Sequence, residues 1–195
     1  MRVIEPIYDG YRFRSRIEAK WAVFWKHIGL PFFYEKEGYD LGGTYYLPDY
    51  FIPAFDAFIE IKADPPTAEE IRKCALLHPQ SGKTVLLLQG EPWPGRYRAL
   101  LFDRDALDNA GEEARPYLEG IILQCGRCEC LIFVAEDDGG EPYVWHSLGH
   151  KNRTCSMGTC VERDPELTDA LRAAFEVAMQ ARFERGPMGR RENHY

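Results

Sequence analysis

The chain of 195 residues lacks any run of about 18 apolar residues, the length that an α-helix needs to cross a membrane, so no membrane span is expected. Its N-terminus, MRVIEPIYDG, has none of the charged, apolar and small-residue regions that make up a secretory signal peptide. Together these two absences predict a protein of the cytoplasm.

Positive charge is also scarce, because 24 lysines and arginines stand against 31 acidic residues and the formal net charge is −7. A protein that binds nucleic acid through bulk positive charge would have the opposite balance. A local basic patch could still hold DNA, and we expect the densest basic stretch either to contact a phosphate backbone or to be a solvated helix face. That stretch contains Arg12, Arg14, Arg16, Lys20 and Lys26.

The signatures of several enzyme classes are absent too. No Ser-His-Asp or Cys-His arrangement stands out along the chain. The segment Ser81-Gly82-Lys83-Thr84 has the last residues of a phosphate-binding loop, but Leu77 stands where the first glycine of that motif belongs. The segment also leads into a strand pattern rather than a helix, so we expect a simple turn there.

Hydrophobic periodicity predicts a helix, three strands, a second helix and a fourth strand. The expected ranges are 15–28 for the first helix, 32–35, 44–51 and 55–62 for the strands, 67–77 for the second helix and 84–89 for the last strand. Ser15 and Thr67 are the expected N-caps, and Glu70 completes a capping box with Thr67. An α/β fold, with helices packed on a mixed sheet, accounts for this order.

The remainder of the chain has a different composition. Residues 90–115 are rich in Pro, Gly, Arg, Asp and Glu and predict an irregular connection. A unit with a cysteine cluster and two strand-like runs begins near Tyr117, and Asp164-Pro165-Glu166 predicts the start of a C-terminal helix. The expected organisation is a first domain at 1–115, a small β module at 116–163, a helix at 164–186 and a flexible tail at 187–195.

The segment Tyr45–Lys62, YYLPDYFIPAFDAFIEIK, places three charged residues among apolar ones. Glu60 and Lys62 are two residues apart on an expected strand, so they face the same side. Asp49 is expected on the preceding strand, and its carboxylate approaches that of Glu60 if the two strands pair. Close carboxylates disfavour each other's ionisation, and a bound Mg²⁺ would remove that cost. Such a site could cleave a phosphodiester, with Lys62 orienting the attacking water or neutralising the developing charge.

These residues also have ordinary structural interpretations, which stay open at this point. Asp49 after Pro48 could form a turn, as aspartate often does. Glu60 and Lys62 could belong to the solvated face of an edge strand, since alternation with a polar face is common in antiparallel sheets.

Pro48-Asp49 and Glu60-Ile61-Lys62 resemble the motif of the PD-(D/E)XK nuclease superfamily, which includes restriction endonucleases, Holliday-junction resolvases and many phage nucleases. The order helix, three strands, helix, strand over residues 15–89 is similar to the core of that family. The resemblance implies a restriction-endonuclease-like αβββαβ core in which Asp49 and Glu60 bind Mg²⁺ or Mn²⁺ and Lys62 is the catalytic lysine. It also implies that the backbone carbonyl of Ile61 completes the coordination.

Glu18 has two competing interpretations. Many members of the family add a glutamate from the first helix, and Glu18 in RSRIEAKW fits that position. Ser15-x-x-Glu18 is also a capping box, which needs no catalysis. The two roles exclude each other only if the carboxylate folds back on its own helix.

The six cysteines suit metal ligation or burial as thiols better than disulfides, because the expected compartment is reducing. Cys125-x₂-Cys128 and Cys155-x₄-Cys160 together offer four thiolates for a tetrahedral structural Zn²⁺ in a zinc-ribbon-like module. Other completions are also open, since His146-x₃-His150 could replace one cysteine pair and Cys130 could compete with Cys128. Cys74 lies on the apolar face of a helix and is expected in the core.

The sequence therefore predicts a Mg²⁺-dependent DNA endonuclease with a zinc module that grips DNA or a protein partner. If a phage encodes it, it works in the host cytoplasm; if it is a resolvase, it needs two sites and hence a homodimer. The competing hypothesis is a catalytically silent adaptor with a nuclease-like fold that acts through its zinc module. The preferred DNA structure, and even the choice between DNA and RNA, cannot be inferred from these residues.

Metal analysis of freshly purified, chelator-free protein tests the zinc prediction. One zinc per chain is expected, because a unit of about 45 residues has too small a core to fold securely without a metal. Substantially less than one zinc per chain would contradict the ribbon and favour buried free thiols.

Overall fold

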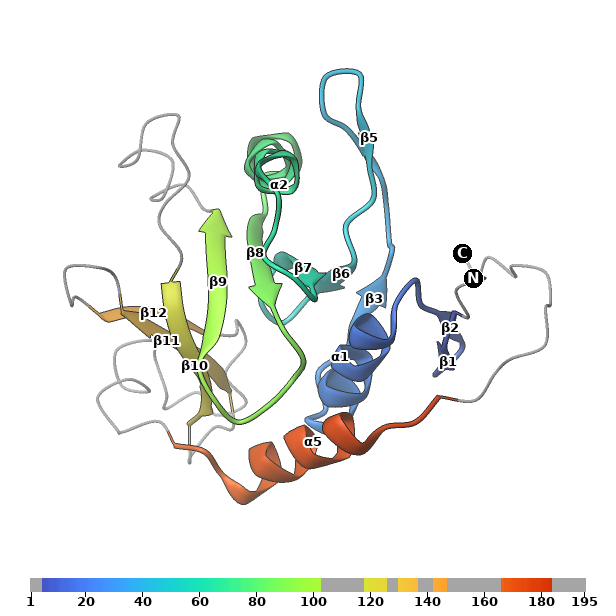
Figure 1. Cartoon of the computed structure of the whole chain (residues 1–195). Helices are drawn as coiled ribbons and strands as arrows, with labels where there is room; N and C mark the ends of the chain where they lie inside the picture. Colours follow the sequence, from blue (N-terminus) through green and yellow to red (C-terminus); the bar gives the residue numbers. More distant parts are fainter. Residues whose placement is uncertain (1–4, 103–117, 126–129, 137–141, 147–165, 184–195) are drawn as a thin grey trace.

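The computed structural model describes residues 5–102, 118–125, 130–136, 142–146 and 166–183. These residues form an α/β fold with three helices and one mixed sheet of eight strands (Figure 1). Among the described helices, none is both long and apolar enough to cross a membrane.

The helices are α1 (Arg16–His27), α2 (Ala68–Ser81) and α5 (Asp169–Gln180). The eight strands of the sheet are β3 (Phe33–Tyr34), β6 (Tyr50–Ile52), β7 (Ala57–Lys62), β8 (Thr84–Gln89), β9 (Tyr97–Phe102), β10 (Leu118–Gln124), β11 (Leu131–Glu136) and β12 (Pro142–His146). Two short hairpins stand outside it, formed by β1 (Ile7–Tyr8) with β2 (Tyr11–Arg12) and by β4 (Tyr39–Asp40) with β5 (Tyr45–Tyr46).

The strands of the sheet follow the spatial order β12-β11-β10-β9-β8-β7-β6-β3. Only β7 and β8 run parallel, and α2 connects them; every other neighbouring pair is antiparallel. A parallel pair needs such a crossover, whereas β6 and β7 are joined by the tight turn at residues 53–56.

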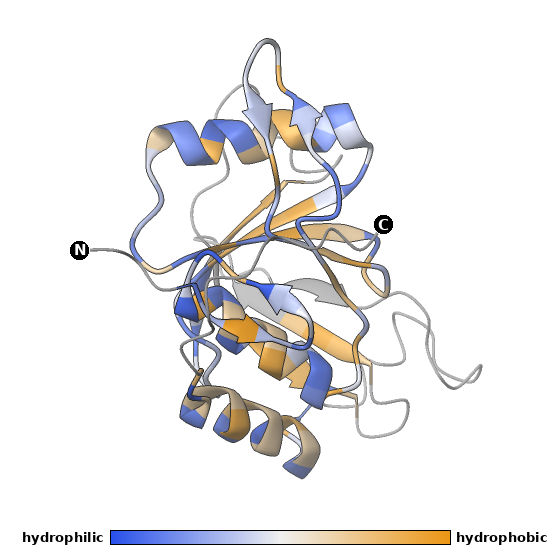
Figure 2. Cartoon of the chain, turned by 90° about the vertical axis from the view of Figure 1, so that its right-hand side faces the viewer, coloured by the Kyte–Doolittle hydropathy of each residue, from blue (hydrophilic) through white to orange (hydrophobic). Residues whose placement is uncertain are grey.

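The sheet has a core on each of its two faces. Ile59 and Ile61 of β7 point to the face covered by α1 and α5, and Phe58 points to the face covered by α2. Successive strand residues face opposite sides, so Glu60 and Lys62 lie on the α2 face. The helices are polar on their outer surfaces and the strands between them are largely apolar (Figure 2).

The two helices on the first face pack on each other through aromatic rings. Phe24 of α1 stacks on Phe175 of α5 with ring centroids 4.6 Å apart, and Trp21 stacks on Trp25 at 5.0 Å. All four side chains are buried. In Figure 1, α5 lies beside α1 below the sheet, so α1 is held between the sheet and the C-terminal helix.

Several predicted elements are confirmed. The first helix begins after the N-cap Ser15, and α2 has the complete Thr67–Glu70 capping box. The predicted strand at 84–89 matches β8 residue for residue. The expected C-terminal helix is also present as α5, and it buries Leu171, Ala174, Phe175 and Ala178.

Other boundaries are wrong. The strand expected at 44–51 is two strands, β5 in a hairpin and β6 in the sheet, and Asp49 lies just before β6. The expected irregular connection at 90–115 contains β9, a buried strand. The second helix continues through Pro79 to Ser81, where the Ser81 hydroxyl donates to the Leu77 carbonyl at 2.7 Å.

The region expected as a separate module shares the main sheet. β10 pairs with β9, β11 with β10 and β12 with β11, so their strands extend the sheet that contains β7 and β8. The C-terminal helix starts at Asp169 with Thr168 as N-cap rather than at residue 164. Residues 164, 165 and 186, and the predicted tail at 187–195, lie outside the described residues.

The docking of α5 on α1 predicts a large stability effect. Phe175→Ala is expected to lower the free energy of unfolding by about 3–5 kcal/mol, because it removes a fully buried ring. Val177→Ala on the same helix is the matched control, since Val177 is exposed and its loss is expected to change stability by no more than about 0.5 kcal/mol. Urea unfolding followed by circular dichroism measures both, and equal losses in the two variants would contradict the packing.

Candidate functional site

The antiparallel ladder between β6 and β7 stops at Pro48. Its register pairs Tyr50 with Ile59, so Pro48 stands opposite Ile61. The Gly90 N–H donates to the Lys62 carbonyl on the β8 side at 2.8 Å, which means that the N–H and C=O of Ile61 point to the β6 side. A proline has no N–H to donate, so the ladder supplies no donor to the Ile61 carbonyl.

The side chain of Asp49 occupies the position where the ladder ends. The Ile61 N–H donates to Asp49 Oδ2 at 2.8 Å, and the Asp49 N–H donates to Glu60 Oε2 at 3.2 Å. Asp49 and Glu60 are 2% and 4% exposed, respectively. The Glu60 carboxylate therefore lies against the backbone of Asp49, and the Ile61 carbonyl points to the same side of β7 as the Asp49 side chain, while the approach of one carboxylate to the other stays a prediction.

Each of these buried carboxylates is paired with a cation. Arg14 Nη2 donates to Asp49 Oδ1 at 2.6 Å, and Lys62 Nζ lies 3.0 Å from Glu60 Oε1. Burial of an unpaired charge costs several kcal/mol, so each cation offsets part of the cost of burying the carboxylate beside it.

Both cations also contact a second, more exposed carboxylate. Arg14 Nε lies 2.8 Å from Glu35 Oε1, and Lys62 Nζ lies 3.0 Å from Glu70 Oε1. Each cation is thus shared between an inner carboxylate, Asp49 or Glu60, and an outer one, Glu35 or Glu70. Because carboxylates outnumber cations, the site has an excess of formal negative charge.

One half of the Ser15–Glu18 capping box is formed, because the Glu18 N–H donates to Ser15 Oγ at 3.2 Å, while the Glu18 carboxylate accepts from the Ser15 hydroxyl and the Arg14 N–H. Ser15 Oγ donates to Glu18 Oε1 at 2.6 Å, and the Arg14 N–H donates to Glu18 Oε2 at 3.2 Å. The Tyr34 hydroxyl also donates to Glu18 Oε2, and the Glu18 side chain is buried. Glu18 therefore ties the helix to β3 next to Arg14, and its participation in catalysis stays a prediction.

The environment shifts the pKa values of the charged groups. Burial, followed by the nearby carboxylates of Glu60 and Glu18, raises the pKa of Asp49 well above its usual range. Burial opposes the charge on Lys62, but attraction to Glu60 and hydrogen bonds to Glu70 and Glu60 outweigh it, so the pKa of Lys62 is raised. Lys62 is therefore protonated at neutral pH, which suits charge neutralisation rather than proton abstraction.

Glu70 has the opposite shift. A hydrogen bond from the Thr67 backbone N–H, together with Lys62, lowers the pKa of Glu70 to about 2. The capping residue of α2 is thus a negative charge beside Lys62 at neutral pH.

Tyr46 and Cys74 also lie near Glu60. Burial, followed by Cys74 and Glu60, raises the pKa of Tyr46, whose hydroxyl contacts the buried Cys74 thiol. Cys74 is in the core, as expected.

The donor set suits a hard divalent cation. In the part of the chain that the structure describes, no three His, Cys, Asp or Glu side chains are grouped as a ready metal site. Mg²⁺ needs no such group, because it is usually bound by one or two carboxylates with water and substrate oxygens. Asp49, Glu60 and the Ile61 carbonyl provide that set, and the excess of negative charge around them favours a cation.

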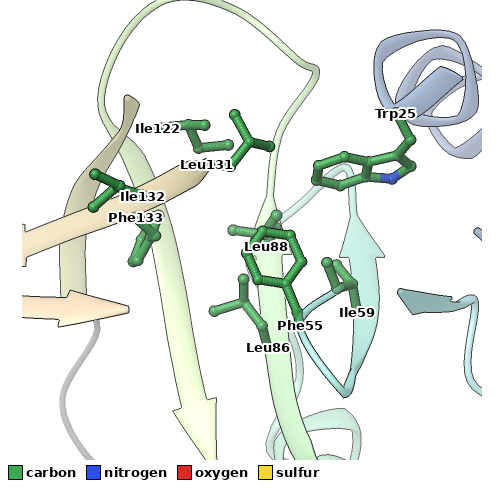
Figure 3. A pocket seen from close by; sticks show the side chains of 9 residues that line it. All are labelled: Trp25, Phe55, Ile59, Leu86, Leu88, Ile122, Leu131, Ile132 and Phe133. Carbon is green, nitrogen blue, oxygen red and sulfur yellow. The ribbon is translucent and has the colours of Figure 1, made fainter. Parts of the chain in front are cut away.

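A pocket in the core lies away from these residues. Its nine lining residues, among them Trp25, Ile59 and Leu88, are apolar or aromatic, and all but Ile132 belong to the core on the α1 face (Figure 3). Glu60 and Lys62 point to the opposite face of the same strand, so the pocket is a feature of core packing and not of the charged site.

Only part of the predicted zinc site can be located. Cys125 and Cys130 are buried at the two ends of the connection between β10 and β11, and the Cys125 N–H donates to the Cys130 carbonyl at 3.0 Å. Cys128, Cys155, Cys160 and His150 lie outside the described residues. His146 ends β12, and its side chain is outside them as well.

Sequence reasoning missed the second partner of each cation. Glu70 was recognised only as a helix cap, and Arg14 only as one member of a basic stretch. Nothing in the sequence pointed to Glu35, whose contact with Arg14 depends on the placement of β3 beside β6. For Tyr34, the one available signal was that a buried tyrosine hydroxyl usually needs a hydrogen-bond partner.

Comparison of the chain with protein-family models, with curated proteins and with solved structures finds no match.

The raised pKa of Asp49 predicts a pH-dependent gain in stability when its charge is removed. A carboxyl whose pKa is higher in the folded than in the unfolded state costs stability as the pH rises above its unfolded pKa, near 3.8. In EDTA, Asp49→Asn is therefore expected to have a higher Tm than the wild type at pH 7, and the difference should shrink toward pH 3.8. Thermal unfolding across this range checks it, and a lower Tm for the variant at pH 7 would show that the pair with Arg14 outweighs the burial cost.

Proposed function

We propose that this protein is a metal-dependent DNA endonuclease of the PD-(D/E)XK type, with a restriction-endonuclease-like core. The observation that carries the proposal is the convergence of Asp49, Glu60, Ile61 and Lys62 where the β6–β7 ladder ends. A scaffold protein has no need to bury two neighbouring carboxylates beside a half-buried lysine, because such burial costs stability.

The order of the elements supports the same proposal. The chain runs through α1, β3, β6, β7, α2 and β8, which is the helix, three-strand, helix, strand order that the resemblance implies. The β4–β5 hairpin is inserted between the first two of these strands. The glutamate position on the first helix corresponds to Glu18, one turn from the Arg14–Asp49 pair.

In this proposal, Asp49, Glu60 and the carbonyl of Ile61 hold Mg²⁺ or Mn²⁺. When bound, the metal polarises the scissile phosphate and lowers the pKa of an attacking water. The protonated Lys62 neutralises charge that develops on the phosphate, and Glu70 keeps its ammonium group directed at the site. Glu60 accepts a hydrogen bond from the Asp49 N–H, which fixes the position of one carboxylate relative to the other.

The zinc module remains part of the proposal. Cys125 would supply one thiolate, and the set that completes the site, with Cys128, Cys155 and Cys160 or with His146 and His150, is to be identified by metal analysis of cysteine variants. A zinc-stabilised unit at the connection between β10 and β11 would hold DNA or a protein partner. A homodimer would be required if the substrate were a branched junction with two strands to cut.

The alternative is an adaptor protein that cuts nothing. The net charge of −7 favours it, as does the pairing of both buried carboxylates with cations of the chain itself. It predicts that Mg²⁺ leaves the Tm unchanged and that no nucleic acid is cleaved.

A cleavage assay over linear, nicked, branched and single-stranded DNA and over RNA, with Mn²⁺ or with EDTA, tests the proposal. The wild type is expected to cut at least one DNA substrate only when metal is present. Lys62→Met and Glu60→Gln should lower the rate by about 10²-fold or more, because each removes a charge that acts on the reacting phosphate.

Lys73→Met is the matched control, because Lys73 lies on α2 and pairs with Glu69 of its own helix, away from Asp49 and Glu60. It should retain the wild-type rate. Circular dichroism and the Tm of each variant separate loss of chemistry from loss of folding. If no substrate is cut, or if folded Lys62→Met cuts as fast as the wild type, the nuclease proposal is refuted.

A further inference from the structure

Arg14 is placed unusually for a residue that holds a buried carboxylate. Its side chain is 50% exposed, whereas the Asp49 side chain that it contacts is 3% exposed. It lies just before the N-cap of α1, outside the helix, and its backbone N–H contacts the Glu18 carboxylate and the Tyr34 hydroxyl. The backbone of Arg14 is thus fixed, while its guanidinium group reaches into the site from the solvent side.

The oxygen that Arg14 contacts is the one that a divalent cation would need. Asp49 Oδ2 already accepts the Ile61 N–H at 2.8 Å, and Oδ1 accepts Arg14 Nη2 at 2.6 Å. A cation that coordinates Asp49 through Oδ1 therefore competes with Arg14 for that oxygen.

Glu35 provides a second position for the same guanidinium group. Glu35 Oε1 lies 2.8 Å from Arg14 Nε, and the Glu35 N–H donates to the Asp49 backbone carbonyl at 2.9 Å. The outer carboxylate is thus fixed to the backbone of the inner one. If the bond to Asp49 breaks, Arg14 keeps one ion pair and does not have to become fully solvated.

We infer that Arg14 is an exchangeable counter-ion of the metal site: it neutralises Asp49 in the metal-free protein and moves to Glu35 when a divalent cation binds. Its freed Nη groups then face the solvent side of the site, where they can contact a phosphate of the substrate. This inference rests on the proposed function and adds a specific role for Arg14 and Glu35 as positioning residues. It involves no covalent step, and the arginine stays charged throughout.

Competition between Arg14 and the metal makes a prediction that a purely structural role does not. Arg14→Gln should bind Mn²⁺ about tenfold more tightly than Arg16→Gln, because hydrogen bonds between charged groups contribute roughly a factor of ten or more. Arg16→Gln is the matched control: it makes the same change in net charge two residues away, and Arg16 is exposed. Electron paramagnetic resonance of free Mn²⁺ measures the dissociation constants, and Asp49→Asn identifies the binding that belongs to this site.

The stability of Arg14→Gln provides a second readout. In EDTA its Tm should fall below that of Arg16→Gln, because Asp49 is left buried without its cation. At saturating Mn²⁺ the difference should disappear, since the metal now neutralises Asp49. If Arg14→Gln is unfolded in EDTA and folds when Mn²⁺ is added, the same conclusion follows.

The role of Glu35 is tested by a substitution that is expected to weaken Mn²⁺ binding rather than strengthen it. Glu35→Gln should bind Mn²⁺ more weakly than Glu37→Gln, because Arg14 has lost the position to which it withdraws. Glu37 is two residues away and half exposed, so its replacement controls for the loss of one negative charge.

The outcomes separate this inference from the proposed function. If Arg14→Gln binds Mn²⁺ no more tightly than Arg16→Gln while the wild type binds it through Asp49, then Arg14 does not compete with the metal and the inference is overturned, whereas the nuclease proposal stands. If the wild type binds no Mn²⁺ that Asp49→Asn abolishes, both fail together.

Discussion

The missing N–H of Pro48 is the constraint on which the site depends. The register of β6 and β7 places Pro48 opposite Ile61, so the antiparallel ladder ends one residue before the carboxylates meet. The Asp49 side chain then accepts the Ile61 N–H that a strand residue would otherwise have bonded. A proline followed by an aspartate thus does two things at once: it ends a strand and it turns a carboxylate and a carbonyl toward the same space.

The second requirement is charge compensation in a buried place. Asp49 and Glu60 are removed from water by the packing of β6 and β7, and this burial, together with the nearby carboxylates, raises the pKa of Asp49. Arg14 and Lys62 offset this cost without filling the site with apolar side chains. Evolutionary selection for stability alone would replace such a cluster with hydrophobic residues of similar volume, so its presence indicates a function.

The parts of this structure that could be predicted from sequence are those determined by local rules. Ser15 and Thr67 mark helix starts because their side chains bond the backbone three residues on, and Glu60 and Lys62 share a face because strands alternate. The strand β9 was missed because Pro, Gly and charged residues around it dominate the composition. Arg14 and Glu35 meet Asp49 only through the arrangement of α1, β3 and β6, and no spacing along the chain encodes that arrangement.

The position of α1 between the sheet and α5 has a consequence for the order in which the molecule is assembled (Figure 1). During synthesis, Phe24 leaves the ribosome long before Phe175, so one side of the first helix stays uncovered until the C-terminal helix has emerged. The segment before α1 carries Arg14, and the first turn of α1 carries Glu18. The charged cluster therefore reaches its final rigidity late, and a ribosome-bound fragment that ends before α5 would carry every residue of the motif without holding them firmly together.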